Sequence, residues 1–254
     1  MRRQIHGCQT NLIRVKVFID MEKPHVLGIL GGLGPMAGAY FYELLITHTK
    51  ADSDQEHIDT VLSGRASTPD RTAFICGRSD QNPLDQMLAD AKRLVAYGAD
   101  ILAMPCNTAH YFYDSLSRSL PVPLINIVEV TVKRAREQGC TKVGIMATEG
   151  TVTTGTYQKY CDAVGLSWEV PSREGQDRLN KIIYDEIKPG KEPDMESFNQ
   201  VARELTERGC QRIILGCTEL SLLRRQRDLG PLYIDSLETL AFEAIKACGK
   251  EIRY

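Results

Sequence analysis

Two cysteines stand where a thiol could do chemistry. Cys106 lies in residues 104–110 (MPCNTAH) and Cys217 in residues 216–219 (GCTE), each directly after a short apolar run. The Asn and Thr residues that follow them begin helices well, so each thiol is expected beside a helix N-terminus, which stabilises a thiolate. The alternative interpretation is a small buried side chain. Two opposed thiols could exchange a disulfide, or could remove and return a proton on the two faces of one carbon atom, which inverts a stereocentre.

A weak internal repeat places these cysteines at equivalent positions. Residues 26–30 (VLGIL) resemble residues 142–146 (KVGIM). In each half a helical pattern ends in glycine, an apolar strand follows, and the cysteine comes eight residues after the glycine. Self-similarity on this scale indicates a duplicated α/β unit. Because ligands of open α/β folds bind beyond the carboxyl ends of the strands, the repeat predicts that both cysteines meet across one pocket.

Short apolar runs alternate with helical patterns from residue 25 onward. Helical spacing is clearest in residues 83–97, before Gly98, and in residues 198–205, before Gly209. The alternation predicts an α/β fold of two similar doubly wound, mostly parallel-sheet domains, related by pseudo-two-fold symmetry, with the active site in the cleft between them. Residues 1–24 are interpreted as a leader or extension. The expected strands are 26–30, 60–63, 101–105, 124–128, 142–147, 212–215 and 232–234.

Composition excludes several classes of partner. The chain has 31 Lys and Arg against 33 Asp and Glu, a net charge of −2, which gives no electrostatic footprint for nucleic acid or an anionic membrane. No apolar run approaches the roughly 18–20 residues of a membrane span. No secretory signal is recognisable, so we expect a cytoplasmic protein with reduced thiols. No cysteine spacing suits a metal. The other cysteines are interpreted as buried or incidental: Cys8, Cys76, Cys140, Cys161, Cys210 and Cys248.

Four motifs together resemble the signatures of the aspartate/glutamate racemase family. They are residues 31–36 (GGLGPM), 69–73 (PDRTA), 104–110 (MPCNTAH) and 216–219 (GCTE), and the resemblance covers residues 25–250. It implies a homodimeric racemase of a small acidic amino acid, aspartate ahead of glutamate, that uses no cofactor and no metal. It also implies that the chain crosses back after Pro231. The first domain is then residues 25–127 plus 236–254, and the second is residues 128–235.

The resemblance also carries residue roles. Cys106 and Cys217 are implied to be the catalytic acid and base, one for each face of the α-carbon. Arg71 and Lys188 are implied to bind the distal carboxylate, since a guanidinium fork matches a carboxylate. The further substrate-binding residues it implies are Asp70, Thr72, Asn107, Thr108 and Ala109, and additional pocket candidates are Thr148, Gly150, Thr151, Thr218 and Glu219.

Two neighbouring features are interpreted as support for this site. Residues 31–34 (GGLG) lack the spacing of a dinucleotide-binding loop, so we expect the backbone to approach a small substrate there, and we include Leu33 among the substrate-binding residues. His110 is expected to pack or to support the site rather than to act as a base.

Two alternative functions stay open. One is another enzyme of this fold, such as a hydantoin racemase, maleate isomerase or arylmalonate decarboxylase; the other is a two-lobed binding protein without turnover.

Overall fold

In the computed structural model, which describes residues 25–254, the chain forms two four-stranded sheets whose neighbouring strands are all parallel. The first sheet has the order β2-β1-β3-β4 and the second the order β6-β5-β7-β8, so each strand has a counterpart in the other sheet. The predicted α/β fold is confirmed; the predicted leader and Cys8 lie outside the described residues. The strands are β1 (Leu27–Leu30), β2 (Thr60–Ser63), β3 (Ile101–Ala103), β4 (Leu124–Ile125), β5 (Lys142–Ala147), β6 (Ser167–Glu169), β7 (Arg212–Gly216) and β8 (Tyr233–Asp235).

Helices connect the strands in both halves. In the first half they are α1 (Pro35–His48), η1 (Asp54–Glu56), α2 (Arg71–Ile75), α3 (Leu84–Tyr97), η2 (Thr108–Phe112) and α4 (Tyr113–Arg118). In the rest of the chain they are α5 (Ile127–Glu137), α6 (Glu149–Thr153), α7 (Thr156–Ala163), α8 (Arg173–Lys181), η3 (Ile182–Ile187), α9 (Met195–Glu207), α10 (Thr218–Gln226) and α11 (Ser236–Ala247). Within residues 25–254, no helix combines the length and apolar character needed to cross a membrane.

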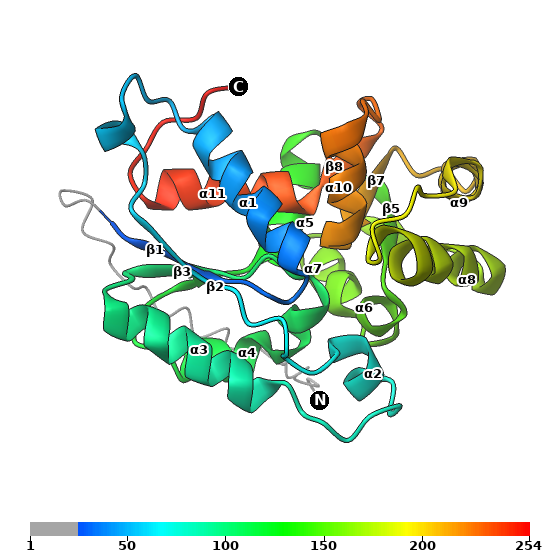
Figure 1. Ribbon diagram of the computed structural model, residues 1–254. Coiled ribbons are helices and arrows are strands. Elements are labelled where there is room, and N and C mark those ends of the chain that lie inside the picture. The colour runs from blue at the N-terminus through cyan, green and yellow to red at the C-terminus, as the bar shows by residue number, and fades with distance from the viewer. Residues whose placement is uncertain (1–24) are drawn as a thin grey trace, which may run out of the picture.

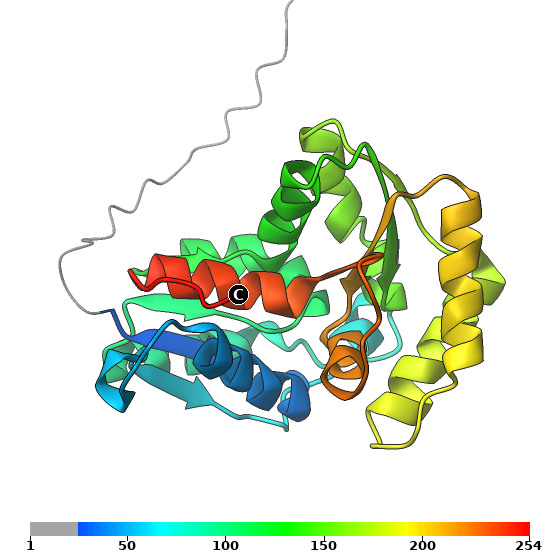
Figure 2. The same cartoon turned by 90° about the horizontal axis from the view of Figure 1, so that it is seen from above.

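Helices cover both faces of each sheet, as the alternation of elements predicts. Figure 1 shows α1 and α11 on one face of the first sheet, and α3 with α4 on the other. At the second sheet, α8 and α9 lie on one side, whereas α5 and α7 lie on the other (Figures 1 and 2). Each half is therefore doubly wound.

The internal repeat has a packing reason. At Gly28 in β1, a Cβ atom would lie 2.4 Å from the side chain of Leu102 and 3.3 Å from Leu94 of α3. At Gly144 in β5, a Cβ atom would lie 2.9 Å from the side chain of Leu205 of α9. Glycine in a strand interior commonly marks such a close approach. In both halves the glycine thus admits a leucine of a helix against the second strand in the sheet order, and in the first half it also admits a side chain of the neighbouring strand β3.

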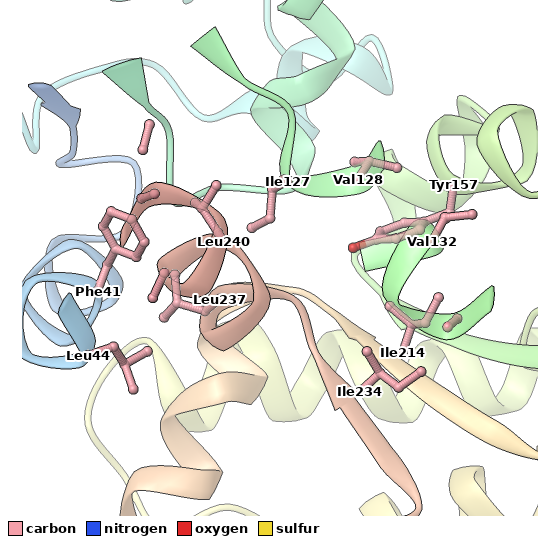
Figure 3. Packing of buried hydrophobic residues seen from close by; sticks show 14 of the residues in the cluster. Phe41, Leu44, Ile127, Val128, Val132, Tyr157, Ile214, Ile234, Leu237 and Leu240 are labelled. Carbon is pink, nitrogen blue, oxygen red and sulfur yellow. The ribbon is translucent and has the colours of Figure 1, made fainter. Parts of the chain in front are cut away.

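One hydrophobic core joins the two halves. Helix α11 follows the last strand of the second sheet and packs against both α1 and α5. Figure 3 shows Leu237 and Leu240 of α11 near Phe41 of α1. The same buried cluster continues through Ile127 of α5 to Ile214 of β7. Removing this apolar surface from water stabilises the placement of one sheet relative to the other.

Some strand predictions need correction. The strand expected over residues 124–128 ends at Ile125, because the side chain of Asn126 accepts the N–H groups of Val128 and Glu129, at 3.0 and 3.1 Å, and starts α5. The strand expected over residues 101–105 ends at Ala103, ahead of a proline that has no N–H to donate. The edge strand β6 is absent from the prediction, since its three residues carry no apolar run.

Candidate active site

The two cysteines of the repeat lie at equivalent strand ends. Cys106 follows β3 and Cys217 follows β7, and these strands take the same place in their sheets. Both residues are buried, with 6% and 3% of their surface exposed. The backbone N–H of Ala109 lowers the pKa of Cys106 and that of Glu219 lowers the pKa of Cys217, each against the larger effect of burial. Cys106 lies two residues before η2, and Cys217 directly precedes α10. Both sulfurs therefore sit at the start of a helical turn.

Glu219 and Lys188 form a charged pair beside Cys217. The S–H of Cys217 donates to Glu219 Oε2 at 3.1 Å, and Lys188 Nζ lies 3.1 Å from Glu219 Oε1. The charges of Glu219 and Lys188 act on Cys106 as well as on Cys217. One charged pair thus influences the pKa of thiols that follow strands of two different sheets.

Burial decides the protonation of the two thiols. It raises the pKa of Cys106, with the guanidinium of Arg71 acting in the opposite direction. It raises the pKa of Cys217 well above its usual value, and the carboxylate of Glu219 adds to the increase. The expectation that the helix starts favour thiolates is wrong for the net effect, because loss of hydration outweighs the nearby N–H groups. Of the two sulfurs, Cys106 has the neighbours that favour a thiolate more.

Arg71 is buried and binds backbone oxygens. Its Nη1 donates to the carbonyls of Thr68 and Pro69, at 3.2 and 2.9 Å, and its Nη2 donates to the carbonyl of Leu33 at 2.7 Å. Nε is buried and has no hydrogen-bond partner among the described residues. Arg71 therefore ties the glycine loop to the turn before α2. Three of its five N–H groups are used in this way, so Nε is one of two donors that remain for a ligand. The positive charge also acts on Cys106.

Three threonine hydroxyls form a closed group where the two halves meet. Thr108 Oγ1 lies 2.8 Å from the hydroxyl of Thr148 and 3.1 Å from that of Thr151, and the last two are 3.0 Å apart. Gly150 permits this approach, because a Cβ atom there would lie 3.1 Å from Thr72 Oγ1 and 3.3 Å from Thr108 Cγ2. A hydroxyl both donates and accepts, so the group can reorient its hydrogens toward a carboxylate.

Lys188 directly follows a turn of π-helix, η3. Such turns are frequent at functional sites. Within this turn, Tyr184 donates its hydroxyl to Thr72 Oγ1 at 2.7 Å, and the Lys188 ammonium lies 5.3 Å from the centre of the Tyr184 ring. Tyr184 thus links Lys188 of the second half to α2 of the first. Tyr184 is a site residue that the sequence analysis missed, since a single tyrosine among apolar and acidic neighbours carries no distinguishing pattern.

Asn107 does not cap the helical turn that it precedes, contrary to expectation. Its Nδ2 donates to Ser236 Oγ at 2.9 Å, and its Oδ1 accepts the hydroxyl of Tyr157 at 2.7 Å. The 3-10 helix η2 has no side-chain cap. The amide of Asn107 therefore forms hydrogen bonds with residues distant in sequence, and not with the N–H groups of the helical turn that follows it.

His110 supports the backbone of the site. Its Nδ1 donates to the carbonyl of Cys106 at 2.8 Å, and its Nε2 accepts the N–H of Ile127 at 3.2 Å. Burial lowers the pKa of His110 to about 4. A neutral ring with both nitrogens bound to backbone is no base, which agrees with the expectation for this residue.

The remaining candidates lie as follows. Asp70 is exposed, and its carboxylate caps α2 by accepting the N–H of Ala73 at 2.7 Å. Ala109 is fully buried, and Thr218 is buried as the first residue of α10. The other cysteines of the described range are free, as expected of buried or incidental thiols: Cys76 is half-buried, and Cys140, Cys161, Cys210 and Cys248 are buried.

Comparison with known proteins points to one family. Residues 30–244 match the family model described as Asp/Glu/Hydantoin racemase. The chain is 28% identical over 202 residues to the broad specificity amino-acid racemase RacX of Bacillus subtilis (strain 168), which covers 77% of this chain and 86% of that protein. It is similar in structure to Picrophilus torridus aspartate racemase, with a TM-score of 0.80 and 27% identity over 90% of this chain and 96% of that one. An aspartate racemase homologue from Pyrococcus horikoshii OT3 gives a TM-score of 0.71 and 25% identity over 89% and 99%.

Proposed function

We propose that this chain, which belongs to the Asp/Glu/Hydantoin racemase family, interconverts the L- and D-forms of an acidic amino acid, aspartate ahead of glutamate, with two thiols. The chain is an amino-acid racemase, an isomerase. The observation that carries the finer proposal is the pair of buried thiols, Cys106 and Cys217, that follow equivalent strands and whose pKa values respond to the same charged pair. One thiol for each face of a carbon atom is what inversion by proton transfer requires.

In the proposed reaction, the thiolate of Cys106 removes the α-proton from one face of the substrate. The C–H bond breaks, its electron pair stays on the α-carbon and spreads into the α-carboxylate, and a new S–H bond forms. Cys217 then gives its S–H proton to the opposite face and becomes the thiolate. The reverse reaction exchanges the two roles. Arg71 supports the Cys106 thiolate, since its charge is the strongest influence opposing burial at that sulfur.

The charged groups of the site favour a dicarboxylate with an ammonium group. Lys188 and the free Nε of Arg71 are donors for the carboxylates of the substrate, and the threonine hydroxyls supply further hydrogen bonds. Glu219 offers the counter-charge for the α-ammonium. Donors fixed in a buried site stabilise the carbanionic transition state more than they would in water. Aspartate is put ahead of glutamate because Glu219 stands in the Cys-Thr-Glu form that resembles the aspartate branch of the family.

The test is proton exchange at the α-carbon in D2O without pyridoxal phosphate. Purified chain is given L- and D-aspartate, L- and D-glutamate and a set of neutral amino acids, and racemisation is followed by chiral chromatography. We expect Cys106→Ser and Cys217→Ser each to lose racemisation by at least about 100-fold. Cys76→Ser is the matched control, since this half-buried thiol has no role in the proposal.

The outcomes separate the competing functions. Full racemisation in either Cys106→Ser or Cys217→Ser would refute the two-thiol mechanism. Turnover of a hydantoin, maleate or an arylmalonate in place of an amino acid would assign the chain to another reaction of the fold. Binding of aspartate, seen as a thermal shift, without exchange or racemisation would leave a binding protein.

A further inference from the structure

A buried string of hydrogen bonds connects the backbone near one catalytic thiol to the backbone near the other. The hydroxyl of Tyr157 donates to Asn107 Oδ1 at 2.7 Å, and Asn107 Nδ2 donates to Ser236 Oγ at 2.9 Å. Ser236 Oγ in turn donates to the carbonyl of Leu215 at 2.7 Å. Asn107 directly follows Cys106, and Leu215 lies two residues before Cys217. The string therefore starts in α7, passes the first thiol and ends on the strand that carries the second.

Every side chain of this string is buried. Tyr157 and Ser236 have no exposed surface, and Asn107 is 1% exposed. Burial raises the pKa of the Tyr157 hydroxyl, which keeps it protonated and able to donate. A buried polar group without a partner costs free energy, so each member has a strong preference for this one geometry. The string is thus a rigid connection between the two halves.

We propose that Tyr157 and Ser236 are positioning residues that hold Cys106 and Cys217 at the separation proton transfer requires. The inference rests on the proposed two-thiol function and extends it to residues that touch neither the thiols nor a ligand. Tyr157 and Ser236 fix the amide of Asn107 from opposite sides, and Ser236 fixes β7 as well. A displacement of about 1 Å at a reacting group lowers a rate by up to about 100-fold.

A structural role alone would give a different result from a positioning role. Loss of a buried hydrogen bond lowers stability wherever it occurs, but only a positioning residue changes the distance between the two sulfurs. Tyr160 supplies the matched control. It lies in α7 like Tyr157, and its hydroxyl accepts a hydrogen bond from Asn126 Nδ2 at 2.7 Å. Tyr160→Phe therefore removes the same atom and one hydrogen bond, without touching the string.

The experiment compares the wild type, Tyr157→Phe, Ser236→Ala and Tyr160→Phe in two assays. In the first, a short bis-alkylating reagent joins Cys106 to Cys217, and mass spectrometry measures the yield. In the second, kcat and KM are measured for the best substrate. We expect Tyr157→Phe and Ser236→Ala to lose cross-link yield by at least about 3-fold and kcat by about 10-fold or more, with KM within about 2-fold. Tyr160→Phe is expected to match the wild type in both.

Equal cross-link yields in all four proteins would overturn the proposal, as would equal losses in Tyr157→Phe and Tyr160→Phe. Thermal unfolding of each variant establishes that the comparison is made between folded proteins. If the wild type racemises no amino acid, the two-thiol function fails, and the cross-link yields still decide whether the string sets the distance between the sulfurs. If the wild type racemises and the yields do not change, only the positioning role fails.

Discussion

His110 gives the sharpest quantitative test of the site, because its position beside Cys106 invites the interpretation of a base. Burial lowers its pKa from the ordinary value of 6.5 to about 4, so the unfolded chain binds a proton more tightly than the native one. Stability is therefore complete above the unfolded pKa and falls as the pH drops from 6.5 toward 4. At about 1.4 kcal/mol for each tenfold change in proton affinity, the loss amounts to about 3 kcal/mol of unfolding free energy.

The assay is urea unfolding of the wild type and His110→Asn between about pH 7 and pH 4. Asparagine keeps a donor and an acceptor but does not titrate, so the difference between the two proteins removes the contribution of every other group. We expect the wild type to lose about 3 kcal/mol more than the variant over this range. A difference that stays within about 0.5 kcal/mol, or a native His110 that titrates near 6.5 by NMR, would refute the structural role and restore that of a base.

Three further substitutions test the candidate site and the stability of the fold. Glu219→Gln removes a carboxylate that raises the pKa of the adjacent thiol, so the basic limb of the pH–rate profile should move to lower pH; an unmoved limb contradicts the assignment. Asp90→Asn breaks ion pairs with the partly exposed Arg65, at 2.5 and 2.9 Å, and with Arg93, at 2.6 Å, and should cost about 1–2 kcal/mol in urea unfolding. That cost is present above the usual Asp pKa of about 4 and disappears as the pH falls through the lowered pKa of native Asp90. Gly150→Ala places a methyl group 3.1 Å from the Thr72 hydroxyl, so KM should rise several-fold in initial-rate assays and thermal unfolding should show a loss of about 1 kcal/mol.

The parts of the fold that could be predicted are those whose causes lie in local pattern. The helix expected over residues 83–97 forms, and Gly98 ends it in a left-handed conformation, φ 116°, that favours glycine. The repeated glycines, Gly28 and Gly144, mark the positions at which a helix packs closely against the sheet. Strand β6 has no comparable sequence pattern. Its three residues are extended because they pair at the edge of the second sheet.

In the candidate site, too, some residues could be predicted from local sequence pattern and others could not. Cys106 and Cys217 could be found because the repeat marks both, and the racemase-like motifs mark Arg71 besides. Three other residues could not be found from the sequence: Tyr157, Ser236 and Tyr184. Their hydrogen bonds join residues that are 50, 129 and 112 positions apart in the chain. Such contacts exist only once two sheets have packed against each other. The spacing of residues in the sequence predicts a helix or a strand, but it does not predict which residue of another element will contact it.

Duplication produced two equivalent thiols, but their neighbours are not equivalent. Cys106 has Arg71 as the strongest influence opposing burial, whereas Cys217 donates to Glu219, which raises its pKa further. Cys106 is therefore the thiol that loses its proton more easily, although burial raises the pKa of both. In the proposed mechanism one enantiomer then meets its base directly, while the other first needs the protonation states exchanged. Because two enantiomers have equal free energy in water, kcat/KM must be the same for both directions. The asymmetry of the thiols can then appear only if kcat and KM differ between the two enantiomers by the same factor. Glu219→Gln should bring this factor closer to one, while the two kcat/KM values stay equal.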